Sequence, residues 1–348
     1  MISEAPKRIL IVKLSAIGDV LMATPVARAL RTAFPQSHIA WVVERKSADI
    51  VLDNPYLDEV IVSGRTKVGH GLTDSANLLR SLMSLRGELK SRRFDVCVDL
   101  QGLLRSAAVC MISGAKKRIG SADAAECSQL LYTDKYASGP DVINIQQRNL
   151  DLLKPLGVDS TETAMYMPVC EDDRVFANGF FEDNNLANDK VVAFCVATTW
   201  LNKHWTPEGW TGVADLIWRK YGVKSLILGA KADIPLARRV ADAAESKPVI
   251  SAGLTTLKQA GALMEKCVAV IGVDTGLLHM AVALDRPTVG LFGASDWRCF
   301  QKKDNFIWVA KDYPCSPCRR HPICSDIDCM KSITPEDVDA AVGRWLEQ

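Results

Sequence analysis

Four short stretches of the sequence place reactive or charged side chains directly after runs of apolar residues. The first is KLSAIGD, Lys13 to Asp19, which follows the apolar run RILIV at 8–12. Because it carries one glycine and an acid, it is neither a G-x-G-x-x-G dinucleotide motif nor a P-loop. A carboxylate here can accept a proton from an attacking hydroxyl. Asp19 also suits a helix cap or first turn, where the helix dipole favours negative charge, and the two roles are compatible.

The second stretch is DLQGLLRSAA, Asp99 to Ala108, again at the end of an apolar run. Gln101 and Gly102 suit a tight turn into a helix, and Arg105 and Ser106 fall in the first turn of that helix. The Arg105 cation could meet an anionic acceptor substrate. It could equally belong to a solvated helix face.

The third stretch is ATTWLNKHW, Ala197 to Trp205, which places the hydroxyls of Thr198 and Thr199 and the ammonium of Lys203 after a strand. A lysine in such a loop, with hydroxyls nearby, suits a phosphate group as a point-charge partner. The next helix starts at 206–208 with a threonine cap followed by proline.

The fourth stretch, VIGVDTGLLHMAVALDRP at 270–287, has the strongest pattern. Its apolar run predicts a strand, and Asp274, Thr275 and Gly276 follow that strand at the N-terminus of a predicted helix. Backbone N–H groups and the helix dipole at such an end attract a pyrophosphate. We expect Asp274 to act as the helix cap. His279 lies one turn along the helix, either as a ligand contact or as a satisfied helix histidine.

The elements around these stretches alternate between strand and helix. Short Val/Ile-rich runs predict buried parallel strands, and helical periodicity lies between them. The predicted strands are 8–14, 38–44, 59–63, 95–100, 191–197, 225–230, 248–251, 268–274, 287–293 and 306–310. This alternation predicts an α/β fold with two doubly wound, Rossmann-like parallel sheets.

The chain is long enough for two domains. We predict an N-terminal domain over 1–180, a C-terminal domain over 181–333 and a C-terminal helix over 334–348. Ligands of open α/β sheets bind at the carboxyl ends of the strands, where all four stretches lie. The second domain would then hold phosphates while the first presents a base across a central cleft.

Composition narrows the class of partner. Lys and Arg together number 42 against 41 Asp and Glu among 348 residues. The near-zero net charge gives the protein no overall positive potential that would attract nucleic acid. The N-terminus lacks the apolar core of a secretory signal, and no stretch reaches the roughly 18 uncharged apolar residues of a membrane span. We therefore expect a cytoplasmic protein, or one that docks on a membrane surface without entering it.

At these four stretches together the sequence resembles glycosyltransferase family 9, the ADP-heptose:lipopolysaccharide heptosyltransferases. The resemblance implies a GT-B fold and an inverting transfer of heptose from ADP-heptose to the lipid A-linked Kdo/heptose core of lipopolysaccharide, with no metal or other cofactor required. It assigns the general base to Asp19 and places Lys203 beside the donor diphosphate. It assigns Asp274, Thr275, Gly276 and His279 to the donor site. From their hydroxyls beside Lys203, we expect Thr198 and Thr199 to bind the donor as well.

The acceptor side is expected in the first two stretches, at Lys13, Ser15, Gly18, Gln101, Gly102 and Arg105. The ATT…KHW and DLQGL forms look more like the first heptosyltransferase, which adds heptose to Kdo, than the second. Leu278 stands where the family often has Ser, and GASDW at 293–297 where it often has G-P-T-D-P. Neither departure removes a charged group, so they affect the expected substrate more than the expected activity.

Two other functions stay open at this point. A nucleotide-sugar epimerase or hydrolase, or a transferase of another sugar, could use the same two-domain frame. A metal- or redox-responsive binding protein could be built on the compact spacing C-x2-C-x5-C-x4-C, formed by Cys315, Cys318, Cys324 and Cys329. That spacing is compatible with a structural Zn or iron–sulfur site, but also with reduced thiols or a disulfide, and we assign no metal.

Overall fold

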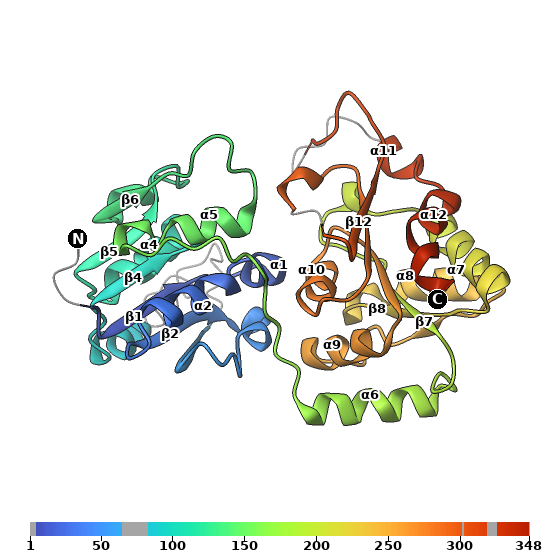
Figure 1. Ribbon diagram of the computed structural model, residues 1–348, viewed down its shortest axis with the longest axis horizontal. Coiled ribbons are helices and arrows are strands. Elements are labelled where there is room, and N and C mark those ends of the chain that lie inside the picture. The colour runs from blue at the N-terminus through green and yellow to red at the C-terminus, as the bar shows by residue number, and fades with distance from the viewer. Residues whose placement is uncertain (1–4, 65–82, 301–302, 319–325, 348) are drawn as a thin grey trace, which may run out of the picture. The chain divides into compact units, whose positions relative to one another are not determined.

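A computed structural model describes residues 5–64, 83–300, 303–318 and 326–347 (Figure 1). The chain divides into two compact units, Met1–Pro168 and Val169–Gln348. The division falls before the boundary at 180 that the sequence predicted. Helix α6 (Glu171–Asp183) packs against α9 (Leu257–Lys266) and therefore belongs to the second unit.

The first unit contains a six-stranded parallel sheet in the order β3-β2-β1-β4-β5-β6. Its strands are β1 (Arg8–Val12), β2 (His38–Glu44), β3 (Glu59–Ser63), β4 (Val96–Asp99), β5 (Lys117–Ser121) and β6 (Asp134–Tyr136). The topology reverses between β1 and β4, whose paired residues Val12 and Asp99 lie at the carboxyl ends of the two strands. This register brings the KLSAIGD and DLQGL loops to one switch point, the usual ligand position in such sheets.

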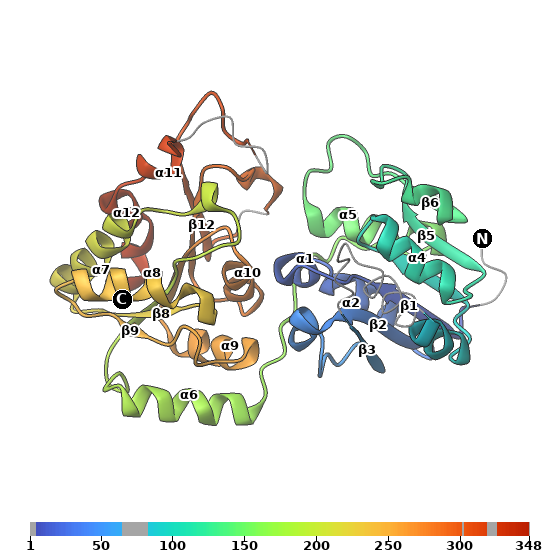
Figure 2. The ribbon, with the colours of Figure 1, turned by 180° about the vertical axis from the view of Figure 1, so that it is seen from behind.

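Helices cover both faces of this sheet. They are α1 (Ile17–Leu21), α2 (Thr24–Ala33), a helix over 83–91, α4 (Leu104–Ile112) and α5 (Ile145–Asp151), with short 3₁₀ turns η1 (Arg45–Ile50), η2 (Ser128–Leu131) and η3 (Lys154–Leu156). Helix α2 packs beside α5, toward the viewer in Figure 1, and α4 is on the face toward the viewer in Figure 2. The helical periodicity between the predicted strands at 59–63 and 95–100 lies over 78–92 and predicts a helix there. That helix is present from residue 83, and 78–82 lie outside the described residues.

The second unit repeats the plan with the order β12-β11-β10-β7-β8-β9. Its strands are β7 (Val191–Cys195), β8 (Lys224–Leu228), β9 (Val249–Ile250), β10 (Ala269–Val273), β11 (Thr288–Phe292) and β12 (Phe306–Ala310). Here the switch point lies between β7 and β10, where the ATTWLNKHW and DTGLLH loops begin. The two parallel sheets with helices on their faces confirm the predicted α/β class.

The remaining helices of the second unit are α7 (Pro207–Tyr221), α8 (Ile234–Ala243), α10 (Gly276–Ala283), α11 (Asp328–Lys331) and α12 (Pro335–Leu346), with 3₁₀ turns η4 (Leu201–Lys203), η5 (Lys231–Asp233) and η6 (Trp297–Cys299). The predicted caps are present, because the Thr206 and Thr334 hydroxyls accept from the amides of Gly209 and Asp337 at 3.0 and 3.2 Å. Helix α12 packs on α7, so the C-terminal helix is part of the second unit.

The core of each unit explains why its central strands are apolar throughout. Every residue of β7, β10 and β11 is buried, as expected for parallel strands covered on both faces. In the second unit the fully buried Trp210 ring packs against Phe194 and Trp205, with centroids 5.2 and 5.1 Å away. Gly209 permits this packing, because a Cβ there would lie 2.4 Å from the Trp205 ring.

The cysteines divide into two groups. Cys97 and Cys195 are buried in the central strands, as small apolar side chains often are. Within the described ranges no three His, Cys, Asp or Glu side chains are grouped to hold a metal ion. Cys324 lies outside those ranges, so the four-cysteine interpretation stays a prediction.

No helix in the described parts of the chain is long and apolar enough to cross a membrane.

Candidate active site

The predicted residues fall into two sets, one in each unit. The set in the first unit is centred on the switch point between β1 and β4. The Gln101 Oε1 atom accepts hydrogen bonds from the amides of Leu14 and Ser15, both at 3.2 Å, and so ties the first two stretches together. Gly102 has a φ of +69°, the left-handed conformation that favours glycine.

Asp99 organises this turn, a role that sequence reasoning missed. Its Oδ1 accepts from the amides of Gln101 and Gly102 at 2.8 and 3.2 Å, and its Oδ2 accepts from the Tyr132 hydroxyl at 2.7 Å. Burial raises the pKa of the Asp99 carboxyl, and the hydrogen bonds only partly offset that rise. Burial and the neighbouring Asp99 raise the pKa of Tyr132 far above its usual range. The pair therefore holds the backbone of the turn.

Asp19 lies in the first turn of α1, where its predicted role in the helix cap or first turn requires it to be. Its Oδ2 accepts from the Ala16 amide at 3.3 Å. The side chain is partly exposed, and Gly18 beside it is buried. The carboxylate is thus held at the strand-to-helix junction while remaining accessible, as a proton acceptor for a bound hydroxyl must be.

Lys13 is the buried cation of the first set, with 7% of its surface exposed. Its Nζ donates to the Leu100 carbonyl at 2.8 Å, and within the described ranges no carboxylate lies within ion-pair distance of it. Burial lowers the pKa of Lys13, and the negative charges of Asp19 and Asp99 oppose the shift. A buried ammonium with one neutral partner is an incomplete arrangement that an anionic ligand would complete.

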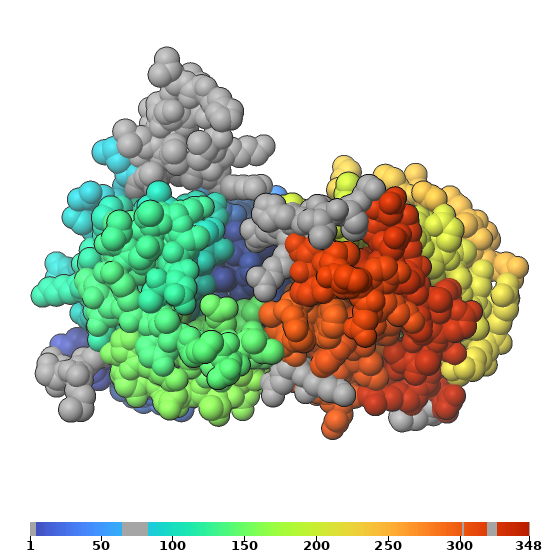
Figure 3. Space-filling view, turned by 90° about the horizontal axis from the view of Figure 1, so that it is seen from above, coloured from blue at the N-terminus to red at the C-terminus, as the bar shows by residue number. Residues whose placement is uncertain are grey.

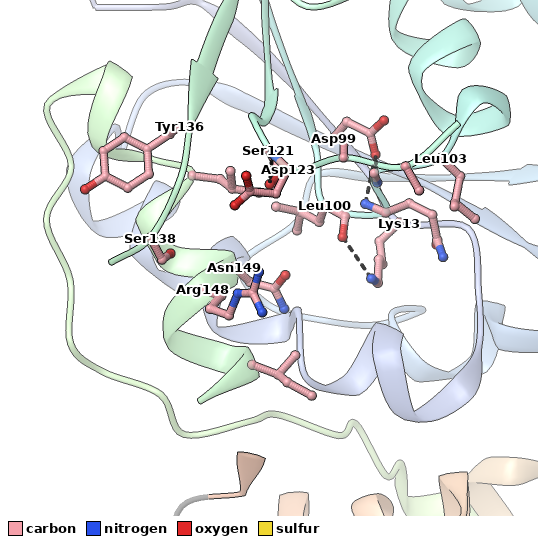
Figure 4. A pocket seen from close by; sticks show the side chains of 16 residues that line it. Lys13, Asp99, Leu100, Leu103, Ser121, Asp123, Tyr136, Ser138, Arg148 and Asn149 are labelled. Carbon is pink, nitrogen blue, oxygen red and sulfur yellow. Dashed lines mark hydrogen bonds between the residues drawn. The ribbon is translucent and has the colours of Figure 1, made fainter. Parts of the chain in front are cut away.

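A pocket of about 340 Å³ opens beside Lys13 (Figure 4). Gln101 and Gly102 line it, and so do Arg148 and Asn149 of α5, which were not predicted as site residues. In the close-up the Arg148 and Asn149 side chains lie on the α5 side of the pocket and Lys13 on the β1 side. The sequence does hold a signal for the start of α5, because Asn144 is a residue type that caps helices. In the structure its side chain accepts from the Gln147 amide at 2.8 Å.

Arg105 is in the first turn of α4, as predicted, but it does not line this pocket. Its guanidinium forms an ion pair with Glu44, a buried carboxylate at the end of β2. About 44% of the Arg105 side chain stays exposed, so one side of the guanidinium can still meet a solute.

The set in the second unit is built around Asp274, directly after β10. Lys203 Nζ contacts Asp274 Oδ2 at 2.6 Å, and His279 Nε2 lies 3.3 Å from Oδ1. The Ser295 hydroxyl also donates to Asp274 Oδ2. Burial alone would raise the pKa of Asp274, but the hydrogen bonds and positive charges of His279 and Lys203 prevail and hold it well below its usual range.

These contacts correct the prediction that Asp274 caps α10. The cap residue is Thr275, which makes no side-chain cap hydrogen bond, and the Asp274 carboxylate points instead to Lys203 and His279. Two cationic partners attract a carboxylate more strongly than the backbone amides of one helix end. The first amides of α10, starting at Gly276, are then left to a ligand.

The ATTWLNKHW loop is fixed to the same centre. The Thr198 hydroxyl donates to the Asp274 carbonyl at 2.9 Å, and His204 Nε2 lies 2.7 Å from the Thr198 carbonyl. Thr199 is exposed next to it. The Trp205 indole anchors the end of the loop by donating to the Ile333 carbonyl at 3.0 Å. His279 is further supported by Phe300, whose ring stacks on the imidazole at 5.0 Å, a contact that sequence reasoning missed.

The comparisons with known proteins agree with this geometry. The model of glycosyltransferase family 9 (heptosyltransferase) matches residues 82–325, and the chain therefore belongs to that family. It is a glycosyltransferase with the two Rossmann-like domains of the GT-B class.

Particular relatives cover nearly the whole chain. Lipopolysaccharide heptosyltransferase 1 of Escherichia coli K12 is 29% identical over 298 residues, 83% of this chain and 88% of that protein. The structure of an E. coli heptosyltransferase with ADP is 25% identical, with a TM-score of 0.70 over 98% of each chain. A family 9 glycosyl transferase from Veillonella parvula shares the fold, with a TM-score of 0.83 at 23% identity over 98% of this chain and 97% of that one.

Proposed function

We propose that this glycosyltransferase moves a heptose from ADP-heptose to the Kdo/heptose inner core of lipopolysaccharide, on a lipid A-linked acceptor. The single observation that carries the proposal is the Lys203–Asp274–His279 arrangement at the N-terminus of α10, in a chain of the heptosyltransferase family. The names of its relatives support the donor and acceptor, and a related heptosyltransferase has been solved with ADP.

The chemistry proposed is one inverting displacement. Asp19 removes the proton from an acceptor hydroxyl, whose oxygen attacks the anomeric carbon from the face opposite ADP. The new bond joins that oxygen to the anomeric carbon as the bond to the diphosphate oxygen breaks. ADP leaves with both electrons of the broken bond, and the Asp19 carboxyl holds the proton.

The donor set is suited to the charge that develops on the leaving diphosphate. Lys203 offers a partly exposed ammonium, and the Thr198 hydroxyl donates to the Asp274 carbonyl beside it. Thr275 and the first amides of α10 follow Asp274 directly in the chain. Fixed donors of this kind stabilise a departing anion without a metal ion. This function requires no cofactor.

The acceptor is proposed to bind in the pocket beside Lys13. A carboxylate on the acceptor sugar would give the buried Lys13 ammonium the anion that it lacks, and the exposed Arg148 guanidinium offers further donors from α5. Ser15, Gly18 and Gln101 keep this loop beside Asp19. Because the acceptor is attached to lipid, we place the enzyme as a peripheral protein at the cytoplasmic face of the inner membrane.

A transfer assay with purified enzyme tests the proposal. ADP-heptose and a delipidated Kdo-containing acceptor should give a heptosylated product and ADP, and ADP-linked ligands should raise the melting temperature more than UDP- or GDP-linked sugars. Turnover of ADP-heptose that does not depend on the acceptor would favour a hydrolase or epimerase instead. Stabilisation by another nucleotide sugar, with none by ADP-heptose, would overturn the donor assignment.

A further inference from the structure

The outer surface of α4 and η2 carries exposed apolar side chains that the catalytic proposal does not use. Leu104 and Met111 of α4 are each 50% exposed, and Leu130 of η2 is 74% exposed. Leu104 and Met111 are seven residues apart and therefore lie on one face of the helix. Because η2 packs against α4, the three side chains are exposed on two adjoining elements, whose surface we name the α4–η2 ridge.

Cations gather at the end of this ridge away from the pocket. The Arg118 guanidinium donates to the carbonyls of Ala115 and Leu131, at the end of α4 and the end of η2, at 3.0 and 2.9 Å. Lys116 is exposed between these points, and the stem of Lys90 lies over Gly114. An exposed apolar strip with lysine and arginine at its border is typical of surfaces that bind anionic lipid.

The opposite end of the ridge adjoins the pocket. Gln101, Gly102 and Leu103 line the pocket directly before Leu104, and the Leu104 amide donates to Glu126 Oε2 at 3.0 Å. Glu126 therefore lies at this end of the ridge, away from Lys90, Lys116 and Arg118. In the view from above, teal-to-green atoms of the first unit lie together on the molecular surface (Figure 3).

We infer that the α4–η2 ridge docks the enzyme on the surface of an anionic bilayer. This inference rests on the proposed function, because a lipid-linked acceptor has a polar sugar that must enter the pocket and an acyl part that must stay in the membrane. The ridge seats Leu104, Met111 and Leu130 among the acyl chains, and Lys90, Lys116 and Arg118 meet lipid phosphates. The pocket at its end then receives the sugar without extraction of the lipid.

Vesicle co-sedimentation tests the inference. Wild-type enzyme should bind vesicles of phosphatidylcholine mixed with phosphatidylglycerol and bind phosphatidylcholine alone much less. The triple variant Leu104→Ser/Met111→Ser/Leu130→Ser should bind the mixed vesicles about tenfold less, and Lys90→Ala/Lys116→Ala should also reduce binding. The matched control Val175→Ser/Leu254→Ser removes two similarly exposed apolar residues from the second unit and should bind like wild type.

Two activity assays separate this surface from the catalytic site. The triple variant should transfer heptose to a delipidated acceptor as wild type does, and lose most transfer to acceptor embedded in mixed vesicles. Wild-type vesicle binding in the triple variant, or equal loss in the control, would overturn the inference. So would a wild-type dimer that the triple variant dissociates without any vesicle binding. Absence of transfer to both acceptors by wild type would instead reject the proposed function, while the binding assay still decides on the ridge.

Discussion

The two units contain the same kind of sheet switch point but arrange charge there in opposite ways. In the second unit, Asp274 has Lys203, His279 and Ser295 as direct partners, so the charges of that centre are largely balanced without a ligand. In the first unit, the buried Lys13 ammonium has one neutral carbonyl. Charged groups that already have partners of opposite charge contribute to stability of the fold. A buried charge without such a partner contributes instead to affinity for a ligand of opposite charge.

The comparison also separates two uses of a carboxylate near a helix N-terminus. Asp274 is buried and held by cations, so it orients Lys203. Asp19 is partly exposed, and the Ala16 amide holds one of its oxygens. Only the second arrangement leaves a carboxylate ready to accept a proton from a substrate.

The largest expected effect is that of Asp19→Asn. An amide cannot take the acceptor proton, so kcat should fall by about 10²- to 10⁴-fold. Affinity for ADP-heptose, measured by thermal shift, should stay near the wild-type value because the donor set is in the other unit. Near wild-type turnover would show that another group is the base.

Asp274→Asn should lower stability as well as disturb Lys203 in the donor site. The substitution leaves Lys203 and His279 without their anionic partner. Urea unfolding at pH 7 should show that the free energy of unfolding falls by about 2–3 kcal/mol. This is less than for a fully buried pair, because the Lys203 side chain is 20% exposed. Since the folded pKa of Asp274 is depressed below its ordinary 3.8, the stabilisation is complete above about pH 4 and is lost as the pH falls further.

The matched control for that variant is Ser295→Ala, which removes one neutral donor from the same carboxylate. Its loss should be about 1 kcal/mol and should change less with pH. Equal losses from the two substitutions would mean that the ion pair contributes nothing beyond a hydrogen bond.

Lys13→Met should weaken acceptor binding without lowering stability, unlike Asp274→Asn. The KM for the acceptor should rise about tenfold, while stability should be unchanged or higher, because a buried cation with an incomplete set of partners is removed. In wild type, the acceptor KM should rise with pH as Lys13 loses its proton, at a pH below the ordinary 10.5 because burial lowers its pKa. Lower stability with an unchanged acceptor KM would make Lys13 a structural residue only.

The smallest expected effect is that of Gly102→Ala. The new Cβ has ordinary contacts of 3.6 Å with Ala124, but the φ of +69° is strained for alanine, and the cost should be about 1 kcal/mol. Thermal unfolding should show this loss, with a small rise in acceptor KM. An unchanged melting temperature would indicate that the turn relaxes without strain.

The sequence was sufficient to predict the central strands and the loops that follow them. Continuous apolar runs such as 191–195 and 269–273 can only be buried on both faces, and parallel strands follow from that. Strands β5 and β6 were missed, because KRIGS and DKY are polar and become strands only by pairing with β4 and with each other. In these outer strands of the sheet, the neighbouring strand determines the structure more than local propensity does.

The partners of the site residues were harder to predict than the residues themselves. Lys203, Asp274 and Ser295 follow three different strands, and only the strand order places them together. The sequence therefore identified Asp274 as important and gave it the wrong contact. Glu44 and Phe300 were missed for the same reason, since each contacts a residue distant in sequence.

The hydrogen bond from the Trp205 indole to the Ile333 carbonyl has a consequence for synthesis of the protein. A nascent chain that ends near residue 300 already contains every residue assigned to the donor, but the loop holding Lys203 still lacks its anchor. A ribosome must add more than thirty further residues before that loop is secured. A premature stop in that interval would therefore leave a polypeptide that encodes every donor residue but lacks the anchor of the Lys203 loop.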